Sequence, residues 1–197
     1  HRISIRRVRL KDHYDDMKVI VPGKTLSEVS KILSGDNEKE VLIYFSENHI
    51  LFEFDNTVVI SRLIEGEYFR ISQMLSSDYE TKVTINKKEF LDSIERATIL
   101  IRENDKKPLI INITEHTMEL KLNSSFGSMN AELFIHKTGK DIMIGFNPKF
   151  LIDALRAIDG EEISIYLMNP KAPCFIRDEE QQYIYLILPV NFNAAAV

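Results

Sequence analysis

Cysteine, long apolar runs and glycine-rich stretches are the features that this sequence has least of. Cys174 is the single cysteine among 197 residues, which excludes an internal disulfide. No apolar run approaches the roughly 20 residues that a membrane-spanning helix needs. With 44% apolar residues, the chain has enough hydrophobic material to form a core without disulfides. These features favour one or two domains in a reducing, cytoplasmic setting without a membrane segment.

Residues typical of catalysis are also scarce. The sequence has no Gly-rich phosphate-binding loop, and Cys174 follows a pattern that favours a buried thiol in a strand over a nucleophile. The five histidines lack the spacing of metal ligands: His1, His13, His49, His116 and His136. We therefore expect no catalytic residue, no metal and no cofactor. Acidic groups at predicted strand connections leave a carboxylate metal site open as an alternative: Glu38/Glu40, Glu161/Glu162 and Asp178/Glu179/Glu180.

A general excess of positive charge is missing as well. The formal net charge is -5, which argues against a protein that coats nucleic acid, so any DNA contact requires a local basic patch. The chain opens with the alternating basic segment His1–Arg9 and no initiator Met, a start typical of the middle of a strand. We therefore expect a fragment of a longer protein, with residues 194–197 as a disordered tail or cloning remnant.

Internal repetition is the most informative pattern present. Three segments begin with a short alternating strand, Val19/Val21, Val83/Ile85 and Ile144/Phe146. Each strand is followed by a residue that suits a helix start, Pro22, Asn86 or Asn147. Two residues later stands a lysine, Lys24, Lys88 or Lys149, and after two more an apolar residue, Leu26, Phe90 or Leu151. The register of this plan is the same in all three copies.

Helical spacing then gives way to period-two alternation. The apolar stripes of the first and third copies are Leu26, Val29, Ile32 and Leu33, and Leu151, Ala154, Leu155 and Ile158. Gly35 and Gly160 are predicted to end these two helices. The strands that follow carry Val41, Ile43 and Phe45, and Ile163, Ile165 and Leu167. The repeated unit is therefore a strand, a helix and then further strands.

The fold class predicted by this pattern is α+β, with more strand than helix. Further strands are expected at Leu51–Phe54, Thr57–Leu63, Leu109–Ile113, Met118–Leu122, Met129–His136, Cys174–Arg177 and Tyr183–Leu188. The segment from Gly66 to Thr81 lacks periodicity, and its loop-like run Ser76–Tyr79 predicts a domain boundary. Residues 1–76 would form half a domain with one repeat, and residues 77–193 a domain with two.

The repeat and several short sequence segments resemble the bacterial DNA polymerase III beta subunit, the sliding clamp family. The matching landmarks are Lys18–Lys24, Leu63–Tyr68, Ile144–Pro148 and Tyr185–Val190, in the family's order and spacing. The resemblance implies the DNA clamp fold, in which helices line an inner concave face and antiparallel sheets lie outside. It also implies a non-catalytic processivity factor that encircles duplex DNA as a head-to-tail homodimer. Residues 1–76 would be the second half of the middle domain, and the first domain would be missing.

The same resemblance places basic helix residues toward the DNA. Lys24 with Lys31, and Lys149 with Arg156, stand seven residues apart, so each pair lies on one helix face opposite the apolar stripe. The middle helix departs from this pattern, since Glu95 follows Lys88 by seven residues and Arg96 lies about 80° around the helix. The predicted DNA-binding residues are Lys24, Lys31, Lys88, Arg96, Lys149 and Arg156. Such residues would bind phosphates without reading bases.

Partner binding is implied at an apolar cleft between the middle and C-terminal domains. Clamp-binding peptides of the DNA polymerase III alpha subunit, the clamp loader and repair polymerases would insert there. The predicted cleft residues are His1, Arg2, Ile3, Phe69, Gln73, Met74, Asn147, Phe150, Pro173, Leu186, Leu188, Val190 and Asn191. Phe69 stands where the family often has proline, and Asn191 where a basic residue can occur, so the peptide preference is open. The resemblance also places Ile99, Leu100 and Ile101 at the ring-closing dimer interface.

Two other functions compete with the clamp hypothesis. One is a carboxylate-dependent metal hydrolase, which would require an ordered divalent ion at one of the acidic groups. The other is a protein-interaction adaptor that uses the same repeat without DNA. Binding of a clamp-type peptide would separate the clamp from both.

Overall fold

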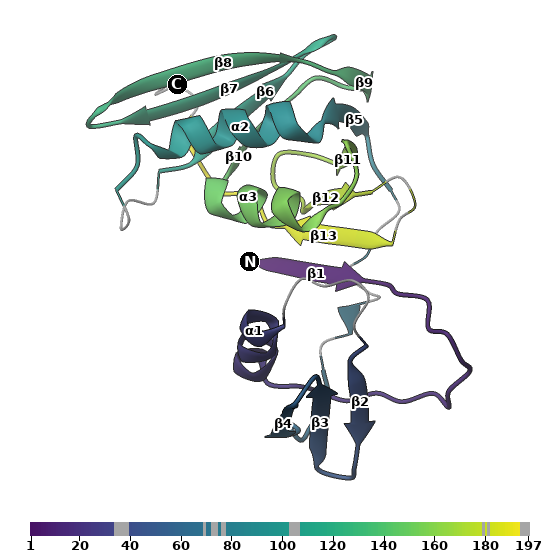
Figure 1. Cartoon of the computed structure of the whole chain (residues 1–197). Coiled ribbons are helices and arrows are strands. Elements are labelled where there is room, and N and C mark those ends of the chain that lie inside the picture. Colours follow the sequence, from purple (N-terminus) through teal and green to yellow (C-terminus); the bar gives the residue numbers. More distant parts are fainter. Residues whose placement is uncertain are drawn as a thin grey trace. The chain divides into compact units, whose positions relative to one another are not determined.

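The chain folds into two compact units that contain different numbers of repeats. The computed structural model describes residues 1–33, 40–68, 70–71, 75, 78–102, 107–178, 180 and 182–193. Residues 10–75 form one compact unit, here the single-repeat unit, and residues 1–9 and 76–197 form the other, the double-repeat unit. Figure 1 shows both. Residues 1–9 group with the later part of the chain, which the sequence did not predict.

The single-repeat unit has one helix and one antiparallel sheet. The helix is α1, Gly23–Ile32. The sheet has the order β2-β3-β4, with β2 at Leu42–Phe45, β3 at His49–Phe54 and β4 at Thr57–Arg62. Its buried core is small and consists of Val29, Ile50, Phe52 and Phe54.

The double-repeat unit contains two helices and two antiparallel sheets. The helices are α2, Lys87–Thr98, and α3, Pro148–Ala157. The six-stranded sheet has the order β1-β13-β12-β11-β5-β9 and the four-stranded sheet the order β10-β6-β7-β8. The strands are β1 Arg2–Arg6, β5 Thr81–Asn86, β6 Leu109–Ile113, β7 Thr117–Ser124, β8 Gly127–Phe134, β9 His136–Gly139, β10 Ile142–Phe146, β11 Glu162–Leu167, β12 Cys174–Arg177 and β13 Tyr183–Ile187. The predicted α+β class with more strand than helix is confirmed.

The two repeats of this unit are joined by an exchange of their first strands. Strand β5 opens the first repeat but pairs with β11 of the second, with Val83 opposite Ile165. Strand β10 opens the second repeat but pairs with β6 of the first, with Ile144 opposite Ile111. The helices α2 and α3 pack side by side, and one sheet lies beyond each of them (Figure 1). Each sheet therefore contains strands of both repeats.

Predicted apolar stripes are buried in the double-repeat unit. Leu151, Ala154, Leu155 and Ile158 all belong to its core, as do Ile163, Ile165 and Leu167 of β11. Cys174 is fully buried in β12, and burial raises the pKa of its thiol well above the usual range. The helical spacing, the alternation and the buried thiol are confirmed here.

The same plan is only partly realised in the single-repeat unit. Although residues 18–22 all belong to the described part of the chain, the predicted strand through Val19 and Val21 does not form there. The physical reason is that β5 and β10 pair with a strand of the other repeat, which this unit lacks. For the same reason Leu26, Ile32 and Leu33 of the predicted stripe are exposed. Among the described residues of this unit, α1 is buried through Val29 against Ile50, Phe52 and Phe54 of its own sheet.

Two further predictions of local structure are wrong. Gly160 does not end α3, because the helix stops at Ala157 and Ile158 already has extended backbone, with φ -94° and ψ 129°. Gly160 is absent from the described glycines with positive φ, so the left-handed helix cap does not form there. The predicted strand Met129–His136 is divided between β8 and β9, which lie in different sheets. The equivalent prediction for Gly35, and the tail 194–197, lie outside the described residues.

Candidate DNA-facing helices and peptide cleft

Asparagine side chains fix where the two helices of the double-repeat unit begin. The side-chain oxygen Oδ1 of Asn86 accepts a hydrogen bond from the Glu89 backbone amide at 3.0 Å. The Asn147 oxygen accepts one from the Lys149 amide, also at 3.0 Å. Pro22 stands before α1 and provides no side-chain hydrogen bond. The predicted start positions are therefore confirmed, and Asn147 is a capping residue in addition to its predicted place at the cleft.

The basic residues predicted to meet DNA lie on exposed helix surfaces. Lys88 and Lys149 stand at equivalent exposed positions in the first turns of α2 and α3. Arg96, near the end of α2, is exposed and donates a hydrogen bond to Ser93 Oγ at 2.8 Å. The double-repeat unit thus presents several cations on two helices that pack against each other.

Ion pairs reduce the positive charge that these helices offer. Arg156 of α3 donates to Glu95 Oε1 of α2 at 2.8 and 3.2 Å. Lys31 of α1 pairs with Glu28 of the same helix at 2.9 Å. Both pairs are exposed, so a phosphate could compete with the carboxylate for either cation.

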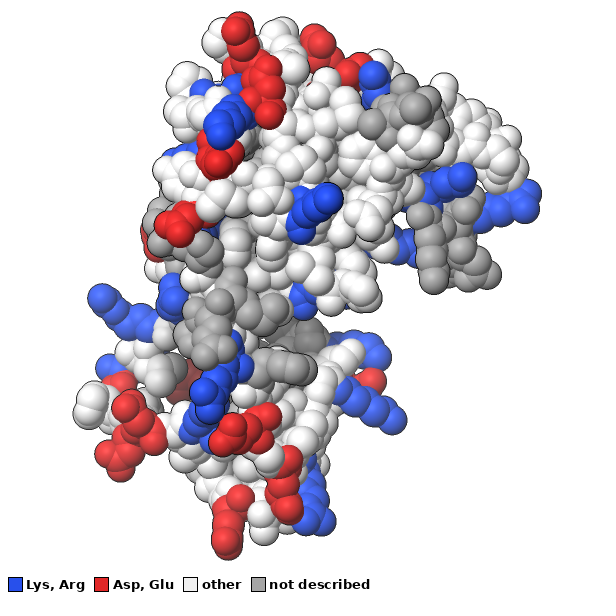
Figure 2. Space-filling model, turned by 180° about the vertical axis from the view of Figure 1, so that it is seen from behind, with Lys and Arg blue, Asp and Glu red and all other residues white. Residues whose placement is uncertain are grey.

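On the face drawn in Figure 2, positive charge is not concentrated in one patch. Figure 2 shows the side opposite to Figure 1, where Lys and Arg are interspersed with Asp and Glu and separated by uncharged areas. This agrees with the net charge of -5. Lys24 and Lys31 belong to the single-repeat unit and are exposed there, so an alignment of all three helices stays a prediction.

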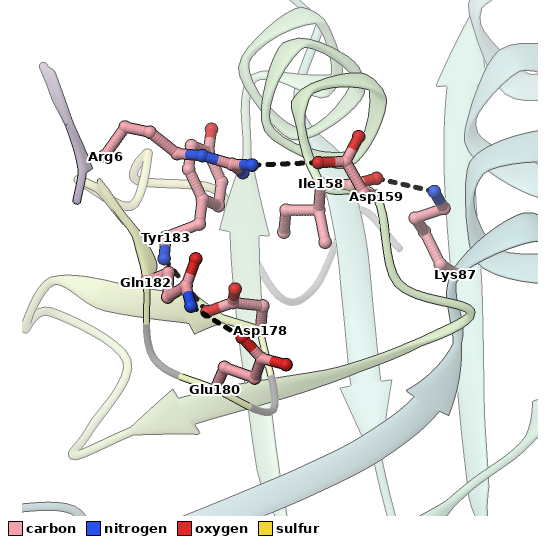
Figure 3. A network of polar contacts seen from close by, with 8 residues as sticks. All are labelled: Arg6, Lys87, Ile158, Asp159, Asp178, Glu180, Gln182 and Tyr183. Carbon is pink, nitrogen blue, oxygen red and sulfur yellow. Dashed lines mark hydrogen bonds and ion pairs between the residues drawn. The ribbon is translucent and has the colours of Figure 1, made fainter. Parts of the chain in front are cut away.

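The C-terminal end of α3 is held by contacts that the sequence did not predict. The Lys87 ammonium, at the start of α2, donates to the Ile158 carbonyl at 2.6 Å. The Arg6 guanidinium of β1 donates to Asp159 at 2.9 Å (Figure 3). A cation at the carbonyl end of a helix is favourable because the helix dipole is negative there. These contacts tie α2, α3 and β1 together.

The turn between β12 and β13 is closed by local hydrogen bonds. The Tyr183 amide donates to the Asp178 carboxylate at 2.9 Å, and the Gln182 side chain donates to Glu180 at 2.6 Å (Figure 3). The Gln182 carbonyl accepts from the Arg7 amide at 2.8 Å, which extends the β1–β13 ladder past Arg6. The acidic group Asp178/Glu179/Glu180 therefore contains carboxylates with structural partners.

Strand β1 brings the predicted cleft residues of the chain start next to those of its end. Ile3 lies opposite Leu186 in the antiparallel pair, and the Leu188 amide donates to the His1 carbonyl at 2.9 Å. Opposite residues share a sheet face, so Ile3 and Leu186 project to the same side. Leu186 is buried and Leu188 is 38% exposed.

Arg2 projects to the other side of β1, toward α3. Its guanidinium lies 4.6 Å from the centre of the Phe150 ring, donates to Tyr185 Oη at 3.2 Å and pairs with Asp153. The hydrogen bond to Asp153 is the main cause that raises the pKa of Arg2. The pKa of Tyr185 is raised by burial, and the Arg2 hydrogen bond opposes that shift. Asp153 and Tyr185 thus hold Arg2 over Phe150.

The residues after β13 run beside the end of β10. The Val190 amide donates to the Gly145 carbonyl at 2.8 Å, and Val190 itself is exposed. A Cβ added at Gly145 would lie 2.8 Å from the Phe192 ring and 3.0 Å from the Val190 carbonyl oxygen, so a larger residue would require this segment to shift. Asn191 is exposed and Pro173 is half-buried just before β12. Phe69, Gln73 and Met74 lie outside the described residues.

The segment predicted at the dimer interface follows α2. Ile99 is 80% exposed, whereas Leu100 and Ile101 are half-buried and pack against the core. Nearby, the Arg102 guanidinium lies 4.4 Å from the centre of the Phe126 ring, just before the edge strand β8. The structure therefore leaves one large apolar side chain of the three in solvent.

Asp153, Lys87 and Gly145 are the positions that sequence reasoning missed. Arg2 and Asp153 are 151 residues apart in the chain, and no spacing rule connects them. Among the residues that the structure describes, no three His, Cys, Asp or Glu side chains converge as around a metal ion. None of the described helices has both the length and the apolarity to span a membrane.

Comparison with known protein families decides the assignment. Residues 1–69 match the central domain of the DNA polymerase III beta subunit, and residues 72–191 match its C-terminal domain. The chain belongs to the DNA polymerase III beta subunit family. The predicted resemblance is thereby confirmed, with two consecutive domain matches in the family's order.

Individual members of the beta subunit family agree. The chain is 34% identical over 194 residues to a beta sliding clamp of Staphylococcus aureus, covering 97% of this chain and 51% of that one. A crystal structure of a beta subunit from Eubacterium rectale has 66% identity and a TM-score of 0.94, and covers 98% of this chain and 53% of that one. The sliding clamp of Bacillus subtilis has 32% identity and a TM-score of 0.90, covering 98% and 52%. The clamp fold is confirmed, and the chain spans about half the length of these relatives.

Proposed function

We propose that this chain is part of a DNA sliding clamp, a non-catalytic processivity factor of the DNA polymerase III holoenzyme. The observation that carries the proposal is the consecutive match to the central and C-terminal domains of the beta subunit. Residues 1–76 would be the second half of the middle domain and residues 77–193 the C-terminal domain. The protein would act in the cytoplasm, without metal or cofactor.

The proposed mechanism is topological. A closed ring around duplex DNA replaces tight binding by confinement, and a partner held on the ring remains at high effective concentration near the template. Lys24, Lys31, Lys88, Arg96, Lys149 and Arg156 would supply contacts to phosphates. Because these cations would read no bases, the ring could slide.

Ring closure would use the end of α2 and the edge of the four-stranded sheet. Strand β8 is the edge strand of that sheet, and Ile99 offers exposed apolar surface beside it. In the whole protein, Ile99, Leu100 and Ile101 would meet the first domain of a second subunit in a homodimer. An edge strand with a nearby apolar patch suits pairing with another chain.

The cleft would bind short peptides of the polymerase alpha subunit, the clamp loader and repair polymerases. Its described members form two groups on opposite sides of β1. Ile3, Leu186 and Leu188 follow one face, and Arg2 and Phe150 lie on the face toward α3. His1, Asn147, Pro173, Val190 and Asn191 would border these groups. The other predicted members, Phe69, Gln73 and Met74, lie outside the described residues.

A peptide titration tests the proposal directly. A fluorescent clamp-binding peptide should give saturable binding to the 197-residue chain. Leu188→Asp should reduce the affinity at least about tenfold, because a buried carboxylate would oppose an apolar peptide side chain. Phe134→Asp is the matched control, since Phe134 is exposed on β8 in the same unit. Absence of saturation, or equal loss in both folded variants, would contradict the cleft.

A salt titration tests the DNA-facing helices. Anisotropy with a labelled duplex should show weak binding whose logarithm falls with the logarithm of salt concentration, at a slope near -0.9 per phosphate engaged. Lys88→Glu with Lys149→Glu should flatten that slope. Lys171→Glu, an exposed lysine outside the helices, is the control. An unchanged slope in the helix variant would remove these lysines from the DNA contact.

A further inference from the structure

Helices α2 and α3 carry opposite charges at one equivalent position. Glu95 stands at the register of α2 where α3 has Arg156, seven residues after the first predicted DNA-facing lysine of each helix. Glu95 Oε1 accepts hydrogen bonds from Arg156 Nε at 3.2 Å and from Arg156 Nη2 at 2.8 Å. The acidic residue by which α2 departs from the basic pattern is therefore paired with the cation that completes this pattern in α3.

The directions of the two helices bring these side chains together. The Lys87 ammonium at the start of α2 donates to the Ile158 carbonyl just after α3, so the packed helices run in opposite directions. Side chains on a helix lean toward its N-terminus. Glu95 and Arg156, which belong to the later part of each helix, therefore lean toward each other.

The predicted DNA-facing cations are consequently divided between a neutral middle and two charged ends. Lys88 and Lys149 lie in the first turns, at opposite ends of the helix pair, each about 10 Å of helix rise from the Glu95–Arg156 pair. Neither lysine forms an ion pair with a described residue. Among the described carboxylates of α2 and α3, Glu95 alone pairs with a predicted DNA-facing cation.

We infer that Glu95 withholds Arg156 from DNA and thereby limits how tightly the helix pair binds phosphates. The inference rests on the proposed function, in which α2 and α3 face duplex DNA. A phosphate that approaches Arg156 meets a neutral pair, since the Glu95 carboxylate balances the guanidinium charge. It can displace the carboxylate only in competition, because the side chains of Arg156 and Glu95 are 64% and 38% exposed and their bond is open to solvent.

This competition changes the salt dependence of DNA binding. A lysine or arginine that binds a phosphate releases about 0.9 counterions from the duplex. When Arg156 leaves Glu95 to bind a phosphate, the freed carboxylate attracts a cation from solution, which offsets most of that release. Arg156 therefore contributes less to the salt slope than an unpaired lysine such as Lys88. The weaker hold on the duplex suits a protein that slides.

Fluorescence anisotropy of the 197-residue chain with a labelled duplex is the first experiment. Glu95→Gln removes the charge and keeps the length of the side chain. It should raise the association constant about three- to tenfold at about 50 mM salt and steepen the salt slope by up to about 0.9.

Glu132→Gln is the matched control for the change in net charge. Glu132 is exposed on β8 between Ala131 and Leu133, which pack against the core, so its side chain projects from the other face of the sheet. This substitution should raise the association constant less than about twofold, because its charge is screened from the helices. An unchanged constant in Glu95→Gln, or an equal gain in Glu132→Gln, overturns the inference.

The lysine variant of the salt titration separates this inference from the proposed function. If Lys88→Glu with Lys149→Glu flattens the slope and Glu95→Gln leaves it unchanged, the DNA contact stands and the role of Glu95 is overturned. If none of these substitutions changes the slope, the DNA contact of α2 and α3 fails, and the inference fails with it.

A double-mutant cycle shows whether Glu95 acts through Arg156. Arg156→Gln should weaken DNA binding about twofold when Glu95 is present and about five- to tenfold in the Glu95→Gln chain. Equal losses in both backgrounds would mean that Glu95 repels DNA by itself, and they overturn the inference. Exchange of the two residues, Glu95→Arg with Arg156→Glu, keeps the pair and serves if a single variant does not fold. The exchanged chain should bind within about twofold of the unaltered one, and a larger change in either direction contradicts the withheld cation.

Discussion

The single-repeat and double-repeat units are built on one plan and differ in whether that plan is completed. In both, a helix starts at an equivalent position and carries an apolar stripe. Leu26 of α1 is 48% exposed, whereas the equivalent Phe90 and Leu151 are essentially buried. The difference teaches that one repeat of this plan does not bury its own helix. Two repeats do so because each supplies the first strand of the other's sheet.

The strand exchange also explains why identical local patterns give different secondary structure. Val19 and Val21 alternate as Val83 and Ile85 do, yet only the second pair lies in a strand. An extended segment gains its hydrogen bonds from a neighbour, so β-propensity alone does not create a strand. Whether the first strand of a repeat forms is thus set by the partner repeat.

Hydrogen exchange should reveal the largest difference between the units. Amides of β5 and β10 should exchange at least about 1,000-fold more slowly than those of residues 18–21, because they open only with a core stabilised by about 5 kcal/mol or more. The measurement is hydrogen exchange of the 197-residue chain followed by mass spectrometry. Equal protection in both regions would show that residues 18–21 already have a partner.

Cavity-forming substitutions should give the next largest difference. Leu151→Ala should lower the free energy of unfolding by about 2–5 kcal/mol, because the side chain is fully buried. Leu26→Ala, at the same register, should cost less than about 0.5 kcal/mol. Urea unfolding, monitored by the hydrogen exchange of amides in each unit, separates the effects of the two substitutions. Similar costs at both positions would mean that Leu26 is packed in solution.

Features encoded within a few residues were predictable from the sequence. Asn86 and Asn147 suit helix starts because a short side chain reaches amides two or three residues ahead. Alternation identified β11, and helical spacing identified the buried side of α3. In these cases the deciding contacts are local or follow directly from residue type.

Features that depend on distant partners were not predictable. The exchange of first strands, the pairing of β1 with β13 and the Arg2–Asp153 contact all join residues far apart in the chain. The candidate cleft was identified through family resemblance, since no spacing rule brings His1 beside Leu188. The prediction that Gly160 ends α3 was wrong because the chain leaves this helix through extended Ile158 rather than through a left-handed turn.

Substitutions at the helix starts should give a smaller difference in stability between the two units. Asn147→Ala should lower the free energy of unfolding of the double-repeat unit by about 1 kcal/mol, because the Lys149 amide loses its acceptor. Pro22→Ala should change the single-repeat unit by less than about 0.5 kcal/mol, since Pro22 provides no side-chain hydrogen bond. Urea midpoints, measured from the hydrogen exchange of amides within each unit, distinguish the effects of the two substitutions. A larger effect at Pro22 would mean that its ring, and not a cap, orders the start of α1.

The exposed ion pairs should give the smallest difference. A double-mutant cycle with Glu95→Gln and Arg156→Gln should give a coupling energy of about 0.2–1 kcal/mol, because both side chains are exposed. The Glu28–Lys31 pair lies within one helix turn and should give at most about 0.5 kcal/mol. Both values should shrink in 1 M salt, where screening is strong. A salt-independent coupling between Glu95 and Arg156 would instead indicate that the two hydrogen bonds to Glu95 Oε1, and not charge alone, hold α2 to α3.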